Sequence, residues 1–254
     1  MPNSQIAAQL YTLREFTKTP ADIANTMKKV RAIGYEAVQV SGMGPIDPHE
    51  LRKIVDGEGL TICTTHTGYD RMKNEPDAVI EDHHIIGCKH PAIGSMPAAY
   101  RTADGYRGFA KEASEVARTL AEGGLTWSYH NHSFEFEKYG DKTGIEILLT
   151  ESDQKYFKLE IDTYWVQHGG GDPAEWILKC KGRIPLLHIK DMGNRGGQPI
   201  MMEIGEGNLN WPRIFAAAEE AGVEWYLVEQ DICERDPFES LAISFRNLKA
   251  MGME

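Results

Sequence analysis

Short β-rich runs alternate with helical stretches along the whole chain, and this alternation limits the folds that it can form. Eight such runs are present, each followed by a helical stretch such as GFAKEASEVARTLAEGG (108–124). A closed barrel of eight parallel strand–helix units takes about 250 residues, and the chain has 254. The β-rich runs are QIAAQLY (5–11), YEAVQVS (35–41), LTICTTH (60–66), CKHPAIGS (88–95), LTWSYHNH (125–132), YFKLEID (156–162), IPLLHIKD (184–191) and EWYLVEQD (224–231).

We therefore expect an α/β fold consisting of a single (β/α)8 TIM barrel, with residues 1–254 forming one domain. The alternative is a doubly wound open sheet, which binds dinucleotides through a GxGxxG motif after a strand. No expected strand is followed by that motif, and the phosphate-binding motif GxxxxGK[ST] is also absent. Neither observation favours the open sheet.

The starts of four expected helices are marked by a capping residue followed by proline, as at Thr19, Asp47, Asp172 and Asp236. The three aspartates also have glutamate three residues later, which is the spacing of a capping box. These signals place helices directly after the loops that follow the strands.

Charge and cysteine usage exclude several classes of protein. The net charge of −11 disfavours binding to nucleic acid phosphates. The four cysteines, Cys63, Cys88, Cys180 and Cys233, have no metal-site spacing, so we expect free thiols in a reducing compartment. The first residues lack the pattern of a signal peptide, and no run approaches the roughly 20 apolar residues of a membrane span. We expect a cytoplasmic protein that contacts no membrane and leave a homo-oligomer open.

Polar side chains gather where the expected strands end. In a barrel of this kind the active site lies at the carboxyl ends of the strands. Any one of these residues could be structural, but their common location favours one shared pocket. They are Gln9, Tyr11, Arg14, Gln39, His66, His130, Asn131, His132, Asp162, His188, Lys190, Asp191, Glu229, Gln230 and Asp231.

Four of these residues form a candidate metal site. His130, Asp162, His188 and Glu229 follow four consecutive strands, which are neighbours in a barrel. Two imidazoles and two carboxylates suit one divalent ion such as Mn, Co, Fe or Zn, whereas Mg prefers oxygen ligands.

Two other polar pairs receive structural interpretations. His83 and His84 are adjacent on an expected helix and point in different directions, so we expect both at the surface. The adjacent acids Glu219 and Glu220 fit a solvated helix face.

The segments QLYTLR, YHNHSFEF, EIDTYWV, RIPLLHIKDM, GEGNLNWPRI and WYLVEQD together resemble the sugar phosphate isomerase/epimerase family of xylose isomerase-like barrels. This resemblance implies a metal held by Asp162, His188 and Glu229. The fourth ligand is usually glutamate in the ketose epimerases, and His130 stands at that position here. Trp165 stands where those epimerases often have histidine.

The resemblance implies a metal-dependent sugar or sugar phosphate isomerase or epimerase that removes a proton next to a carbonyl. Glu229 would be the base, and His130, His132 or Glu135 would return a proton. Lys190 would stabilise negative charge; its alternative role is an ion pair with Asp191 or Glu206. The residues expected to bind the sugar substrate are Gln9, Tyr11, His66, His132, Trp165, Lys190 and Glu206.

Because the chain keeps only one of the two carboxylates that two-base epimerisation uses, another reaction on this barrel is a clear alternative. That alternative is a metal-dependent lyase, dehydratase or hydrolase acting on keto sugars or cyclitols. A nuclease-type enzyme would need a basic face that the sequence lacks, and a sugar-binding barrel without catalysis is the remaining class.

Overall fold

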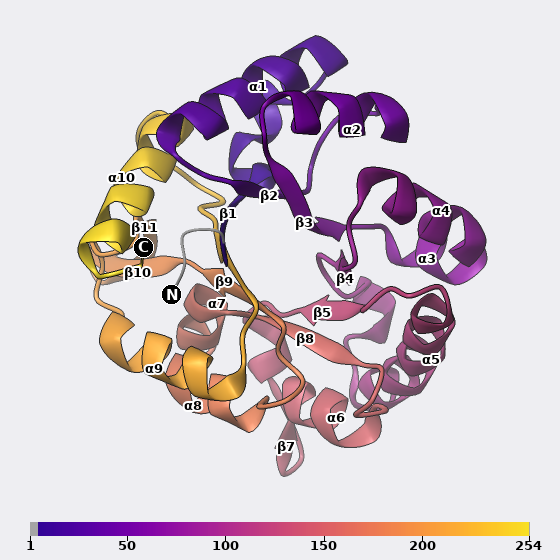
Figure 1. The fold of residues 1–254 in the computed structure, drawn as a ribbon. Helices are drawn as coiled ribbons and strands as arrows, with labels where there is room; N and C mark the ends of the chain where they lie inside the picture. The colour runs from indigo at the N-terminus through magenta and orange to yellow at the C-terminus, as the bar shows by residue number, and fades with distance from the viewer. Residues whose placement is uncertain (1–4, 254) are drawn as a thin grey trace.

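The computed structural model describes residues 5–253 and contains a closed barrel of eight parallel strands (Figure 1). Around the barrel the strands follow chain order, and β1 closes the ring by pairing with both β2 and β12. The expected single barrel is confirmed, while the assignment of residues 1–254 to one domain stays a prediction. The strands are β1 (Ile6–Gln9), β2 (Ala37–Val40), β3 (Thr61–His66), β4 (Pro91–Ile93), β5 (Ser128–His130), β8 (Lys158–Asp162), β9 (Leu186–Ile189) and β12 (Trp225–Val228).

Helices form the outer layer, and most of the apolar core lies between them and the barrel. The longest helix, α5, buries Phe109, Ala113, Val116 and Leu120 along one face. The α-helices are α1 (Pro20–Ile33), α2 (Pro48–Gly57), α3 (Tyr69–Asn74), α4 (Pro76–Ile86), α5 (Ala103–Glu122), α6 (Gly144–Glu151), α7 (Thr163–His168), α8 (Pro173–Lys179), α9 (Trp211–Ala221) and α10 (Pro237–Ala250).

The capping signals correctly marked the start of α1, α2, α8 and α10. Thr19, Asp47, Asp172 and Asp236 each accept hydrogen bonds from backbone N–H groups of the first helical turn. Among these four, the reciprocal capping box forms at Thr19, where the Asp22 carboxylate accepts a hydrogen bond from the Thr19 backbone N–H. At the three aspartate caps only the cap side chain is engaged, so the expected boxes there were wrong.

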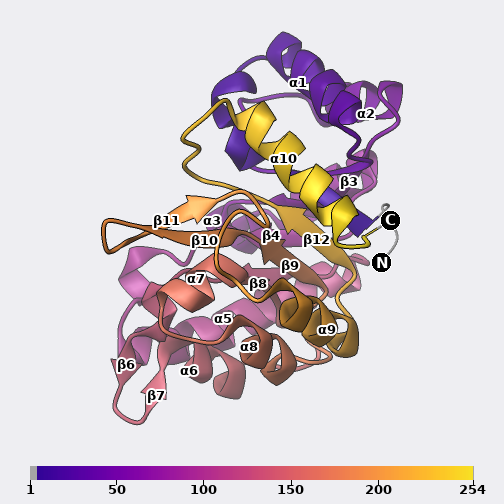
Figure 2. The same cartoon turned by 90° about the vertical axis from the view of Figure 1, so that its left-hand side faces the viewer.

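Two small hairpins extend the end of the barrel where the strands finish. They are β6 (Lys138–Tyr139) with β7 (Lys142–Thr143), and β10 (Asp191–Arg195) with β11 (Gln198–Met202). Figure 2 shows both hairpins at the end of the barrel opposite the last turn of α10. Neither hairpin was expected from the sequence.

The barrel interior changes from apolar to polar along the strands. Ala7, Ala37, Leu186 and Leu227 belong to a small buried cluster that is separate from the main core. Side chains two residues further along a strand point to the same side of it. The corresponding residues are Gln9, Gln39, His188 and Glu229, all of them buried. Because side chains alternate along each strand, the barrel interior has an apolar layer and, above it at the carboxyl end of the strands, a polar layer.

The cysteines and the adjacent histidines differ in how far they are exposed. All four cysteines are free, and only Cys233 is partly exposed. His84 is exposed as expected, but the surface assignment of His83 was wrong, because its ring packs inward. Its two nitrogens contact the Thr65 hydroxyl at 2.8 Å and the Val79 carbonyl at 2.7 Å. Glu219 and Glu220 are both exposed, as expected.

Within residues 5–253, none of the helices combines the length and the apolar character that a membrane span requires.

Candidate active site

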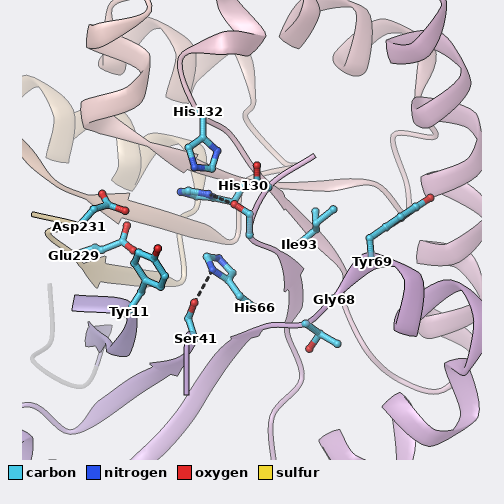
Figure 3. A pocket seen from close by; sticks show the side chains of 14 residues that line it. Tyr11, Ser41, His66, Gly68, Tyr69, Ile93, His130, His132, Glu229 and Asp231 are labelled. Atoms are coloured by element: carbon cyan, nitrogen blue, oxygen red, sulfur yellow. Dashed lines mark hydrogen bonds between the residues drawn. The ribbon is translucent and has the colours of Figure 1, made fainter. Parts of the chain in front are cut away.

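A pocket of about 410 Å³ opens at the carboxyl ends of the strands (Figure 3). Its lining includes the predicted site residues Tyr11, His66, His130, His132 and Glu229. Figure 3 shows Glu229 and Asp231 side by side, with His130 and His132 next to them and His66 across from His132. The prediction that polar strand ends share one pocket is confirmed for these residues.

The four predicted metal ligands lie together at the pocket, which His130 and Glu229 line. His130, Asp162, His188 and Glu229 are buried, and each offers a ligand atom within 4.8 Å of the others. His130 Nε2 is 3.3 Å from Asp162 Oδ2, and His188 Nδ1 is 3.0 Å from Glu229 Oε2. Strand register explains the grouping, because Asp162 and His188 are direct partners in the β8–β9 pair. We call these four residues the ligand quartet.

Hydrogen bonds on the outer side of both imidazoles support the fit of a metal. His130 Nδ1 lies 2.9 Å from the Gly94 carbonyl oxygen, and His188 Nε2 lies 2.8 Å from Gln39 Oε1. A ring nitrogen that donates to such an oxygen leaves the other nitrogen of the ring to bind a metal. In both rings that other nitrogen faces the carboxylates of the quartet, so the residues present fit the expected divalent ion.

Lys190 brings a buried positive charge to the carboxylates of this site. Its ammonium lies 3.1 Å from Asp162 Oδ2, 2.7 Å from Glu229 Oε2 and 2.5 Å from Asp231 Oδ2. Burial alone would lower the pKa of Lys190, but these carboxylates raise it well above its usual value. The alternative ion pair with Asp191 or Glu206 was wrong.

These carboxylates in turn shift the pKa of His188, the imidazole of the quartet that they surround most closely. Burial lowers the pKa of His188, but Glu160 and Glu229 more than reverse the effect and raise it to about 10. Burial raises the pKa of Glu229, whereas Lys190 and His188 hold it well below the usual range. Glu229 is therefore ionised at neutral pH and can accept a proton.

Asp191 and Glu206 instead make their hydrogen bonds at the loop between β11 and α9. Asp191 is buried and accepts hydrogen bonds from the backbone N–H groups of Gly205, Gly207 and Leu209. Trp211 Nε1 donates to the same carboxylate at 2.7 Å. Glu206 is exposed and accepts a hydrogen bond from Asn247 of α10, so the structure places it away from the pocket that it was expected to line.

Glu135 lies behind strand β5 and not in the pocket. It is fully buried, and its carboxylate accepts hydrogen bonds from the Tyr129 hydroxyl at 2.6 Å and from the His132 backbone N–H at 2.9 Å. Burial raises the pKa of Glu135 to about 7. Its location supports the loop that carries His132 and does not match the expected role in returning a proton.

The remaining predicted residues divide between the pocket and its surroundings. Tyr11 is partly exposed at the pocket, and Gln9 lies behind it, accepting a hydrogen bond from the Tyr11 backbone N–H. Trp165 does not line the pocket, but its ring centre is 5.4 Å from that of His132. Burial lowers the pKa of His132 to about 3, so this imidazole is neutral.

Three residues at the site received no role from the sequence. Glu160 is buried inside the barrel and bridges His66 and Gln39. Ser41 lines the pocket, and so does Asp231, which holds Lys190. The signal for Glu160 was available in KLEID, where it stands two residues before Asp162 and therefore on the same side of the strand.

Comparison with known proteins agrees with this architecture. The family described as xylose isomerase-like TIM barrel matches residues 27–250. Inosose dehydratase of Clostridium beijerinckii is 24% identical in an alignment that covers 81% of this chain and 82% of that enzyme.

Solved structures give the same result. A sugar phosphate isomerase/epimerase from Parabacteroides distasonis superimposes with a TM-score of 0.81 and 26% identity, covering 97% of this chain and 94% of that one. An L-ribulose 3-epimerase shares the fold with a TM-score of 0.69 at 16% identity, covering 98% and 94% of the two chains. The family resemblance inferred from the sequence is confirmed, and the protein belongs to the xylose isomerase-like TIM-barrel family.

Proposed function

We propose that the protein is a metal-dependent dehydratase, a carbon–oxygen lyase, acting on a keto cyclitol or keto sugar. The observation that carries this proposal is the distribution of carboxylates and imidazoles in the pocket. Carboxylates come from Glu229 and Asp231, which lie side by side, whereas the other polar groups include the imidazoles of His66, His130 and His132. Epimerisation with two carboxylate bases would need a second acid at the position of His130.

Dehydration needs a base and then a proton donor, and Glu229 could serve as both in turn. Glu229 would take the proton from the carbon next to the carbonyl, breaking that C–H bond. The C–O bond of the hydroxyl on the following carbon then breaks, a C=C bond forms, and the departing hydroxide takes the proton now held by Glu229 and leaves as water, while the neutral His132 hydrogen-bonds that oxygen. Within residues 5–253, the buried His132 Nδ1 has no hydrogen-bond partner, which fits a role toward a substrate hydroxyl.

The ligand quartet and Lys190 would prepare this step. A divalent ion held by His130, Asp162, His188 and Glu229 would supply Lewis acidity toward the carbonyl oxygen. Lys190 balances the charge of the surrounding carboxylates and keeps Glu229 ionised. The name of the Clostridium beijerinckii relative, a dehydratase of a keto cyclitol, supports the same reaction class.

The direct test is product analysis with metal-loaded protein and with protein treated with EDTA. We expect inosose or a related keto sugar to lose one molecule of water, seen by mass spectrometry and NMR, in the metal-loaded sample alone. Glu229→Gln should lose this activity. The matched control is Glu203→Gln. Glu203 is also a buried glutamate, but it accepts a hydrogen bond from Ser240 and lies outside the pocket.

Epimerisation remains the second candidate, because the Parabacteroides distasonis neighbour is described as a sugar phosphate isomerase/epimerase. In that case the same assay would show a change of configuration with no loss of water. Water loss without metal, or no reaction of any keto sugar or cyclitol, would contradict the proposed function.

A further inference from the structure

Glu160 is a buried carboxylate at the centre of the barrel whose function the reaction scheme does not explain. It has no exposed surface, and it accepts hydrogen bonds from Gln39 Nε2 and His66 Nε2, both at 2.8 Å. Its Oε1 atom also lies 3.3 Å from His188 Nε2. A side-chain amide such as that of Gln39 donates through its NH2 group and accepts through its oxygen.

The orientation of the Gln39 amide fixes the direction of the neighbouring hydrogen bonds. The amide turns its NH2 group toward Glu160 Oε1 and its oxygen toward His188 Nε2, each at 2.8 Å. The Gln39 oxygen can only accept, so His188 Nε2 must be the donor across their 2.8 Å contact. The order of donors therefore runs from His188 through Gln39 to Glu160.

The consequence for His188 concerns its other ring nitrogen. With the proton on Nε2 committed to Gln39, Nδ1 faces Glu229 at 3.0 Å and Asp162 at 3.7 Å. Nδ1 is the nitrogen that would bind a metal in the ligand quartet. A ring turned over would instead offer its proton-bearing side to the metal site.

We propose that Glu160 is a positioning residue that, acting through Gln39, orients His188 so that Nδ1 is presented to a divalent metal. This inference rests on the proposed metal site. It also explains why His66, Glu160 and His188 lie within 4.8 Å of one another. Their closeness follows from hydrogen bonding to one carboxylate and requires no second ion.

The experiment measures Zn²⁺ affinity by competition with a chromophoric chelator for the full chain and four variants. Glu160→Gln introduces an NH2 group where only acceptors serve and should weaken Zn²⁺ binding about 10–100-fold. Gln39→Leu should weaken it to a similar extent. The double variant should bind Zn²⁺ about as tightly as the single variant with the lower affinity. Both changes break the same chain of hydrogen bonds, so their effects should not add. The control, Glu203→Gln, should bind as the wild type does.

Nitrogen NMR of the Zn²⁺-loaded protein gives a readout that a general loss of stability would not mimic. The His188 Nε2 proton should exchange slowly with solvent in the wild type and rapidly in Glu160→Gln. Wild-type affinity in a folded Glu160→Gln, or additive losses in the double variant, would overturn the inference. A wild-type protein that binds no Zn²⁺ would overturn the proposed metal site and this inference with it. Should Glu160→Gln not fold, Gln39→Leu binding Zn²⁺ as tightly as wild type would overturn the inference.

Discussion

Replacing Lys190 with methionine should strongly destabilise the metal-free protein. The substitution keeps the length and apolar stem of the side chain and removes its charge. Lys190 and Asp162 have fully buried side chains and Glu229 is 4% exposed, so both carboxylates would lose a buried partner. Breaking such a pair costs about 3–5 kcal/mol, because the remaining charge stays buried without compensation. At about 2–4 °C per kcal/mol, the melting temperature should fall by roughly 6–20 °C.

Thermal and urea unfolding in EDTA would measure this change. Lys181→Met is the matched control, because Lys181 forms an exposed ion pair with Glu220 at 3.2 Å. Exposed pairs contribute at most about 1 kcal/mol. Excess Mn²⁺ or Zn²⁺ should stabilise Lys190→Met more than the wild type, since a bound cation would compensate the same carboxylates. A metal-free Lys190→Met within about 1 kcal/mol of the wild type would refute this account of the site.

Four further predictions follow from particular residues. Asp162→Ala should fold but lose bound metal and activity, as elemental analysis and circular dichroism would show; unchanged metal content would contradict the quartet. Thiol titration of denatured, unreduced protein should find all four cysteines free, and a lower value would indicate a disulfide. Burial lowers the pKa of His83, so the unfolded chain binds more protons below about pH 6.5 and stability should decline there. His83→Gln should make that decline shallower in urea titrations, and an unchanged slope would exclude this contribution. Glu206→Ala should leave activity unchanged, and a large loss of activity in a kinetic assay would indicate that Glu206 does line the pocket.

The ligand quartet could be predicted from the sequence because a parallel barrel brings all strand ends to one face. His130, Asp162, His188 and Glu229 each lie at or near the end of a β-rich run, so strand order alone made them neighbours. The sequence could not show which way each imidazole points. That depends on Gln39 and on the Gly94 carbonyl, which belong to β2 and to the segment just after β4.

The errors arose where the chain leaves the strands. Glu135 follows β5 by only five residues, but the short turn at Phe134–Phe136 places its carboxylate behind the strand, against Tyr129. The β10–β11 hairpin moves Glu206 away from the pocket, and Asp191 holds the loop that follows. Glu160 was missed because a charged residue inside a strand breaks the pattern of apolar interiors on which the prediction relied.

The central claim is that Glu229 removes a proton next to a substrate carbonyl, and solvent exchange tests it most directly. With inosose or another substrate in D2O and metal-loaded protein, NMR should show deuterium entering at the carbon beside the carbonyl. Glu229→Gln should slow this exchange about 10²–10⁴-fold, while Glu203→Gln should exchange at the wild-type rate. Turnover without cleavage of that C–H bond, or wild-type exchange in Glu229→Gln, would contradict the account.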